Sequence, residues 1–283
     1  MRKIFVVFFL AIALVLPAAA MQQDVNQNGI KQMTEPKHFT ADVNNISITV
    51  IYDNNPYKED IETSWGFSCV ITGTDKTILF DTGGKGQLLL ENMSKLAIDA
   101  NDIEIIVLSH IHGDHTGGLE DFLRKNPKVT VFLPESFPKE FKEKVTSLTA
   151  GVVEVDKQTE ICKKAHSTGQ LGTSIQEQGL ILQTEEGLVV VTGCAHPGIV
   201  EMVRSAKSSF NEPVLFVMGG FHLEWATKNR VENIARNFKY MNVEYAGPTH
   251  CTGNRARAIF ASHYGDNYIN IGAGKTIKIE DLK

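Results

Sequence analysis

The chain has little cysteine, no basic stripe, and no repeat or low-complexity tract. Its four cysteines among 283 residues form no Cys-x-x-Cys pair, which argues against a disulfide-rich scaffold. Lys and Arg total 28 against 33 Asp and Glu, and the formal net charge of −5 argues against broad electrostatic binding to nucleic acid or to an anionic bilayer. None of the Gly-Gly pairs continues to Lys-Ser or Lys-Thr, so they do not form a phosphate-binding P-loop. A hydrophobic content of 42% with 22% charged residues is instead typical of a globular protein.

The one strongly apolar run lies at the N-terminus. Residues 2–3 are basic, residues 4–16 carry no polar side chain, and Pro17 is followed by three alanines at 18–20. This is the pattern of a secretory signal peptide over residues 1–20. As a helix the run would rise about 20 Å, short of the roughly 30 Å membrane core, so we expect cleavage and no stable membrane anchor. We therefore expect an exported protein, periplasmic or extracellular, with a formal charge of −7 after two basic residues are removed.

The rest of the chain divides into a polar leader and one domain. Residues 21–44 show no apolar period and are expected to be a flexible leader, and residues 45–283 are expected to form one catalytic domain. Strand patterns are predicted at 46–53, 66–72, 77–81, 103–109, 128–134, 178–184, 187–193, 213–220, 243–247, 268–271 and 275–279. Helical patterns are predicted at 86–96, 119–125, 198–208, 228–241 and 252–263. Loops that line a pocket are expected at 53–65, 134–150 and 166–177. Because both halves run from strands into strand–helix alternation, we expect the α/β class, with two mixed β-sheets flanked by helices.

The segment that follows the predicted strand 103–109 carries the chemistry. His110, His112, Asp114 and His115 fall within six residues, although the whole chain has only nine histidines. On extended backbone His110 and His112 point to the same side, because side chains alternate along a strand. A turn at Gly113 then brings the next two ligands to an adjoining position. Imidazoles with a carboxylate suit Zn²⁺ and similar divalent ions, so this segment predicts a metal site.

The motif HIHGDHTGGL resembles the HxHxDH signature of the metallo-β-lactamase superfamily. Other segments are similar to motifs of the same superfamily: TILFDTGG (77–84), VVVTGCAHPGI (189–199) and GPTHCTGNRA (247–256). Together with GGFHL, they resemble most the branch that includes the archaeal dihydropterin–ribofuranosylaminobenzene phosphate synthase. The resemblance runs over about residues 46–275 and implies an αββα sandwich of the metallo-β-lactamase fold.

The resemblance implies one or two divalent ions, with Zn²⁺ favoured and Mn²⁺ or Fe²⁺ as alternatives. It implies two ligand groups, the first formed by His110, His112 and His196 and the second by Asp114, His115 and His250. Asp81 would accept hydrogen bonds that orient a ligand or the ligand loop. A different register would use His166 as the third histidine of the first group.

Four positions have more than one possible role. Cys194 stands where many relatives carry an Asp that bridges two ions; its thiolate would bind an ion or bridge the pair, or the side chain would only pack beside them. His222 follows a strand and two glycines, and would contact substrate, donate a proton or serve a structural role. Trp65 and Trp225 flank Gly-bearing segments and would either line a pocket or pack in the core, and we expect core packing.

These residues predict a metal-dependent hydrolase that activates water against an ester, lactone or phosphoester of a small molecule. Asp114 would align or accept a proton from that water, and His222 would assist; a Ser–His–Asp or Cys–His pattern is not evident. Two ions would attract a small anionic substrate despite the acidic net charge. The branch resemblance implies a second candidate, a transferase acting on a pterin diphosphate. A third candidate is a metal-bound sensor or binding protein that has lost catalysis. Nucleic acid is not an expected partner, and the oligomeric state stays open.

Overall fold

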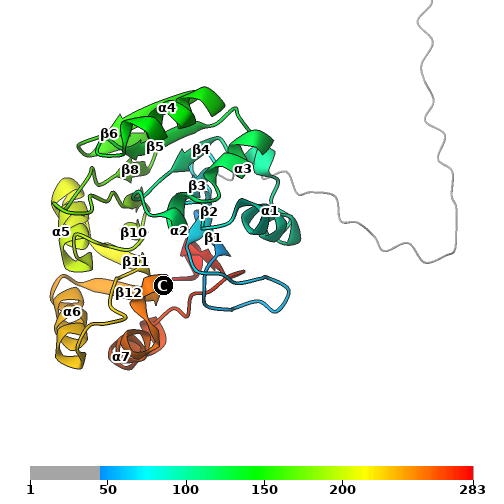
Figure 1. The fold of residues 1–283 in the computed structure, drawn as a ribbon. Helices are drawn as coiled ribbons and strands as arrows, with labels where there is room; N and C mark the ends of the chain where they lie inside the picture. The colour runs from blue at the N-terminus through cyan, green and yellow to red at the C-terminus, as the bar shows by residue number, and fades with distance from the viewer. Residues whose placement is uncertain (1–44, 283) are drawn as a thin grey trace, which may run out of the picture. The chain divides into compact units, whose positions relative to one another are not determined.

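Two mixed β-sheets with helices on their outer faces make up residues 45–282, the part of the chain that the computed structural model describes (Figure 1). The expected αββα arrangement of two helix-flanked sheets is confirmed. The expected signal peptide (1–20) and leader (21–44) lie outside the described residues. Within residues 45–282, no helix is both long enough and apolar enough to span a bilayer.

The first sheet has seven strands in the order β13-β1-β2-β3-β4-β5-β6. β13, β1, β2 and β3 pair antiparallel, whereas β3, β4, β5 and β6 pair parallel. The strands are β1 (Ser47–Tyr52), β2 (Ser68–Thr72), β3 (Ile78–Phe80), β4 (Ile105–Val107), β5 (Thr130–Pro134), β6 (Gly151–Val155) and β13 (Thr276–Lys278).

The second sheet has six strands in the order β12-β11-β10-β9-β8-β7. Its first three strands are parallel and the others antiparallel. The strands are β7 (Thr159–Cys162), β8 (Ala165–Ser167), β9 (Leu180–Gln183), β10 (Leu188–Thr192), β11 (Val214–Gly220) and β12 (Val243–Thr249). Every residue of β10 and β11 is buried, and their near-continuous apolar sequences follow from being covered on both faces.

Helices cover the outer face of each sheet (Figure 1). On the first sheet lie α1 (Gly86–Lys95), α3 (Leu119–Lys125) and α4 (Lys139–Leu148), and on the second lie α5 (Ile199–Phe210), α6 (Lys228–Tyr240) and α7 (Asn254–Tyr264). The four-residue α2 (Gly113–Thr116) lies in the predicted metal-binding segment. In α6, for example, Val231, Ala235 and Phe238 are buried at helical spacing, so one face packs on the sheet and the other meets solvent. A further core lies between the sheets, where Phe80 of β3 and Phe216 of β11 belong to one buried cluster.

Three sequence-based expectations about local structure are corrected. Residues 268–271 form no strand; only Tyr268 makes an isolated bridge, to Ala246. The expected loop 134–150 contains helix α4, whose single buried residue, Val145, gives too narrow an apolar stripe for recognition. The expected loop 166–177 begins inside strand β8, which has only three residues and therefore too little alternation to predict a strand.

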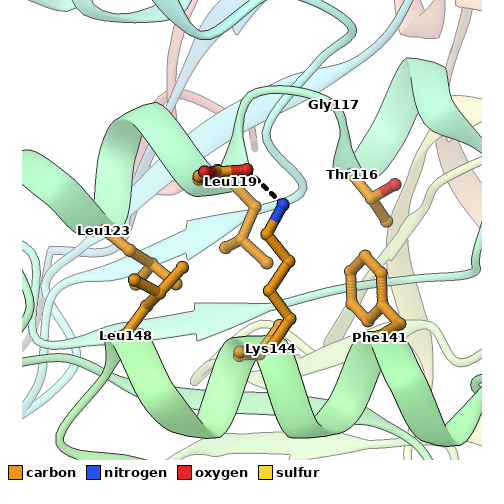
Figure 2. Close-up of a pocket in the computed structure, with 9 residues that line it drawn as sticks. Thr116, Gly117, Leu119, Leu123, Phe141, Lys144 and Leu148 are labelled. Carbon is orange, nitrogen blue, oxygen red and sulfur yellow. Dashed lines mark hydrogen bonds and ion pairs between the residues drawn. The ribbon is translucent and has the colours of Figure 1, made fainter.

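A shallow apolar groove of about 260 Å³ lies between α3 and α4 (Figure 2). Leu123, Leu148 and Phe141 line it, and Lys144 reaches across it to form an ion pair with Glu120. None of the nine lining residues is a histidine, cysteine or aspartate, so this groove is not the metal centre expected from the sequence.

Candidate metal centre

Five strand ends bring the candidate ligands together at one edge of the two sheets. The candidate residues follow the carboxyl ends of β3, β4, β10, β11 and β12 directly or within four residues: Asp81, His110, Cys194, His196, His222 and His250. In each sheet these strands run parallel to their neighbours within this set. Parallel strands present their carboxyl ends at the same edge, which is where open α/β sheets bind ligands.

The HxHxDH segment packs its imidazoles tightly. The ring centroids of His110 and His112 lie 4.7 Å apart, and those of His110 and His115 lie 4.3 Å apart. His112 precedes helix α2 on extended backbone, and its carbonyl accepts the backbone N–H groups of His115 and Thr116. This turn is what brings Asp114 and His115 round to the side of His110, as the sequence predicts.

Asp81 is fully buried beside the candidate ligands and accepts hydrogen bonds from Ser109 and His115. Its Oδ1 accepts the backbone N–H of Ser109 at 2.7 Å, and its Oδ2 accepts the Ser109 hydroxyl at 2.7 Å. The same Oδ2 lies 2.7 Å from His115 Nδ1. A hydrogen bond at Nδ1 leaves Nε2 of His115 directed away from Asp81, so Asp81 fixes the face of the ring that is offered to a ligand. The orienting role expected of Asp81 stays a prediction, for which these contacts are the structural basis.

Two groups of metal-ligating atoms meet at Cys194. The first joins its Sγ to His110 and His196, and the second joins the same Sγ to His115 and His250, with all atoms of each group within 4.8 Å of one another. The Sγ lies 3.2 Å from His115 Nε2. Asp114 completes the second group, with Oδ2 at 3.3 Å from His250 Nε2 and 3.6 Å from His115 Nε2. Cys194 therefore lies between the two predicted ion positions.

The donor set fits divalent ions. Nε2 of His196 is buried and has no hydrogen-bond partner among the described residues. Nε2 of His250 is buried and faces only the Asp114 carboxylate, at 3.3 Å, whereas its Nδ1 is 2.8 Å from Asn54 Oδ1. Buried polar atoms normally have partners, and a metal ion would satisfy both nitrogens. Imidazoles, a thiolate and a carboxylate are the ligands that Zn²⁺ takes in proteins. His110, His112 and His196 would hold one ion, and Asp114, His115 and His250 the other, with Cys194 within reach of both.

Comparison with known proteins agrees with this geometry. Residues 66–199 match the model of the metallo-beta-lactamase superfamily. A curated relative, 7,8-dihydropterin-6-methyl-4-(beta-D-ribofuranosyl)-aminobenzene-5'-phosphate synthase of Methanocaldococcus jannaschii, is 31% identical over 83% of this chain and 97% of its own length. The chain belongs to the metallo-beta-lactamase superfamily. The expected family membership is thereby confirmed.

Solved structures of the superfamily share the fold. Tm1679, described as a metal-dependent hydrolase, superposes with a TM-score of 0.69 at 29% identity, over 82% of this chain and 98% of its own. YhfI of Bacillus subtilis, a metallo-beta-lactamase fold protein, gives a TM-score of 0.60 at 14% identity, over 83% of this chain and 100% of its own. At that identity the second likeness supports the fold alone.

Glu177 is a site residue that the sequence reasoning missed. It is fully buried, and its two carboxylate oxygens accept the backbone N–H groups of Gly193, Cys194, Ala195 and His196 at 2.8–3.1 Å. It therefore holds the loop that carries two candidate ligands. Burial raises its pKa to about 7, against the opposing effect of these backbone donors. The sequence carries no signal for it, because a single Glu in a loop becomes recognisable only when its distant partners are known.

Glu177→Gln should weaken metal binding by about 10- to 100-fold, the range typical for residues that support metal ligands. An amide offers one acceptor oxygen, and its NH₂ group would face backbone N–H donors that need an acceptor. Competition with a chromogenic chelator measures the change in affinity. The exposed hairpin residue Glu186 provides the control Glu186→Gln. Equal affinity in both variants would show that Glu177 does not support the ligand loop.

The structure also places the remaining candidate residues: two histidines and two tryptophans. The His166 ring packs on Phe210 at 4.8 Å and its Nε2 lies 2.9 Å from Gln183 Oε1, so it joins neither ligand group and the alternative register finds no support. His222 is exposed, and its ring lies 4.4 Å from that of His196. Core packing for the tryptophans was wrong: Trp65 is 50% exposed with its ring 4.9 Å from that of His250, and Trp225 is 90% exposed.

Several residues around the candidate metal centre have a strained backbone conformation. Asp81, Ala195, His222 and His250 all have φ between +48° and +57°, a region that non-glycine residues rarely adopt. Each such residue costs about 1–3 kcal/mol and persists where the surrounding structure enforces it, often at functional sites. These four strained residues follow the ends of four different strands. Their clustering indicates that the need to place the ligands outweighs the conformational cost of these turns.

The two ligand groups should differ in the pH dependence of metal binding. Burial lowers the pKa of His115, but the Asp81 carboxylate outweighs it and raises that pKa to about 9. Burial, with neighbouring His222 and His112, lowers the pKa of His196 to about 4. Since an ion binds only neutral imidazole, the ion at His115 must displace a proton below pH 9, whereas His196 is already neutral.

We therefore expect affinity at the second group to fall about tenfold per pH unit from pH 9 to 6 through His115, and affinity at the first group to fall less steeply. Calorimetric titration with Zn²⁺ in buffers of different ionisation enthalpy counts the released protons. Identical pH slopes for both binding events would contradict the assignment of a protonated His115 to one group only.

Proposed function

We propose that the protein is an exported metal-dependent hydrolase acting on an ester, lactone or phosphoester bond of a small, anionic molecule. The observation that carries the proposal is the meeting of two metal-ligating groups at Cys194, beside the buried and unpartnered Nε2 of His196, at the carboxyl-end edge of the sheets. A divalent ion there supplies Lewis acidity to the bond that is cleaved and activates water at neutral pH. The description of Tm1679 as a metal-dependent hydrolase supports this class.

Asp114 would align the attacking water. Burial alone would raise the pKa of this carboxyl, but His250 and His115 outweigh burial and hold it well below its usual range. The group is therefore ionised at neutral pH and can align the water by accepting its hydrogen bond, whereas so low a pKa makes it a weak proton acceptor. Its side chain is 23% exposed, so substrate and water can reach it.

His222 would donate a proton to the leaving group. Its contact with Cys251 raises its pKa above the ordinary value, which favours the protonated, donating form. Its exposed ring lies beside His196, at the open side of the centre. The catalytic role of His222 stays a prediction, which this exposed position supports.

A second candidate is group transfer from a pterin diphosphate. The supporting observation is that the synthase of Methanocaldococcus jannaschii matches this chain over 97% of its own length. In that reaction the same ligand groups would hold ions against the diphosphate, and pyrophosphate would leave. The predicted signal peptide favours hydrolysis, because an exported enzyme would not meet a cytosolic pterin intermediate.

One set of assays separates the candidates. Metal-loaded protein is offered p-nitrophenyl phosphodiesters and phosphomonoesters, lactones and a β-lactam reporter, and separately a pterin diphosphate with an aminobenzene acceptor. We expect turnover in the first set, lost on chelation. Pyrophosphate release with silence in the first set would establish the transferase instead. Silence in both sets at full metal content would overturn both and favour a non-catalytic, metal-bound protein.

A further inference from the structure

A third group of metal-ligating atoms lies beside the centre and is not used by either candidate reaction as a ligand set. Sγ of Cys194, Sγ of Cys251 and a ring nitrogen of His222 lie within 4.8 Å of one another. The three residues follow the ends of β10, β12 and β11, so three separate segments of the second sheet bring them together. All four cysteines of the chain are free thiols in this structure.

The close approach of the two thiols depends on a glycine. A Cβ added at Gly220 would lie 2.7 Å from Cys251 Sγ and 3.2 Å from Cys194 Cα. Any side chain there would therefore occupy the space into which Cys251 Sγ projects. His222, two residues further on, holds a left-handed backbone with φ +53°. The absence of a side chain at Gly220 leaves room for Cys251 Sγ beside Cys194.

The chemistry of the group differs from that of the main centre. Two thiols and one imidazole form a soft donor set without a carboxylate, which selects thiophilic ions such as Zn²⁺. With Zn–S distances of about 2.3 Å, tetrahedral ligands lie about 3.8 Å apart, so donors within 4.8 Å need to close by only about 1 Å. The two cysteines are buried and His222 is exposed, which leaves a fourth position open toward solvent.

We propose that Cys194, Cys251 and His222 form a further site for one thiophilic divalent ion, adjoining the His-rich centre and sharing the Cys194 thiolate with it. The site has three protein ligands and one open position. A water or a donor atom of a small ligand would fill that position. This is the arrangement of zinc sites that bind exchangeable ligands, whereas structural zinc sites are closed by four protein ligands.

The experiment uses the full chain, stripped with a chelator under reducing conditions and titrated with Co²⁺. Cobalt gives a thiolate charge-transfer band in the near ultraviolet, and elemental analysis gives the number of bound ions. Cys251→Ser and His222→Ala should each bind one equivalent less than the wild type, and Cys251→Ser should also lose part of that band. Cys162→Ser removes a half-buried thiol of β7, outside the group, and should match the wild type. His222 is exposed, so its removal does not threaten folding.

Two results would overturn the proposal. One is equal stoichiometry and an equal charge-transfer band in the wild type and Cys251→Ser. The other is a count of two free thiols in freshly purified, denatured protein, with no extra ion bound after reduction, which would identify a Cys194–Cys251 disulfide pair. His222 would serve either as a ligand of this ion or, without the ion, as the proton donor proposed above, so the two roles of this residue are alternatives. His112→Ala should lose main-centre chemistry yet keep the extra ion, so failure of the enzyme assays and failure of this site are told apart.

Discussion

Replacing His112 with alanine should lower hydrolytic turnover by more than about 100-fold, beyond the effect expected for residues that only support metal ligands. The imidazole lies against both His110 and His196, with ring centroids 4.7 Å and 4.8 Å away, so it offers a third nitrogen to the first ion. With one of three nitrogen ligands absent, the first group would hold its ion more weakly, and the water activation that such an ion supplies would be lost. Steady-state kinetics at saturating Zn²⁺ measures the loss.

The same variant should keep its fold. His112 is only partly buried and its backbone carbonyl, which starts helix α2, is retained in alanine. Circular dichroism and thermal unfolding of the metal-free proteins should therefore agree with the wild type. His263→Ala, at an exposed position of α7, is the matched control and should retain full activity. A fully active His112→Ala protein would refute the first ligand group.

Asp81→Asn should destabilise the metal-free protein by about 3–5 kcal/mol at pH 6, the cost of removing one partner from a buried ion pair. Asp81 and His115 are both fully buried and 2.7 Å apart. Asparagine tolerates the left-handed backbone that Asp81 adopts, with φ +55°, so the effect arises from the lost carboxylate and not from strain. Denaturant unfolding in the presence of a chelator measures the change.

The destabilisation should depend on pH in a defined direction. The folded-state pKa of His115 is raised from 6.5 to about 9, so the pair contributes fully below pH 6.5 and its contribution is lost as the pH rises through 9. The difference between wild type and Asp81→Asn should therefore narrow across that interval. Asp60→Asn, at an exposed loop position, should be neutral throughout. A pH-independent difference would mean that Asp81 acts through Ser109 alone.

The sequence predicts the fold and most of the centre because both depend on local signals. Short apolar segments such as β10 and β11 mark buried strands, and each candidate ligand comes at or shortly after the end of such a segment. Parallel pairing then places those ends at one edge without further information. The spacing of His110, His112, Asp114 and His115 carries its own geometry. The clustering of these four residues can therefore be predicted without knowing which distant segments contact each other.

What the sequence does not predict depends on contacts between distant segments. Glu177 acts through four backbone N–H groups of another segment, and no local pattern marks it. Trp65 lies exposed beside His250, although its residue type favours burial. Cys194 has its place between the two ligand groups only in three dimensions. Residues 268–271 show a strand pattern but find only an isolated bridge as a partner.

The central claim is that this edge of the sandwich binds divalent ions through both ligand groups. Elemental analysis of protein purified without added metal and without chelators tests it most directly. We expect at least two equivalents of divalent metal, predominantly zinc, or about three with the Cys194–Cys251–His222 site filled, and a loss of about one equivalent in His112→Ala. A content below about half an equivalent in the wild type, unchanged by that substitution, would contradict the assignment of the site.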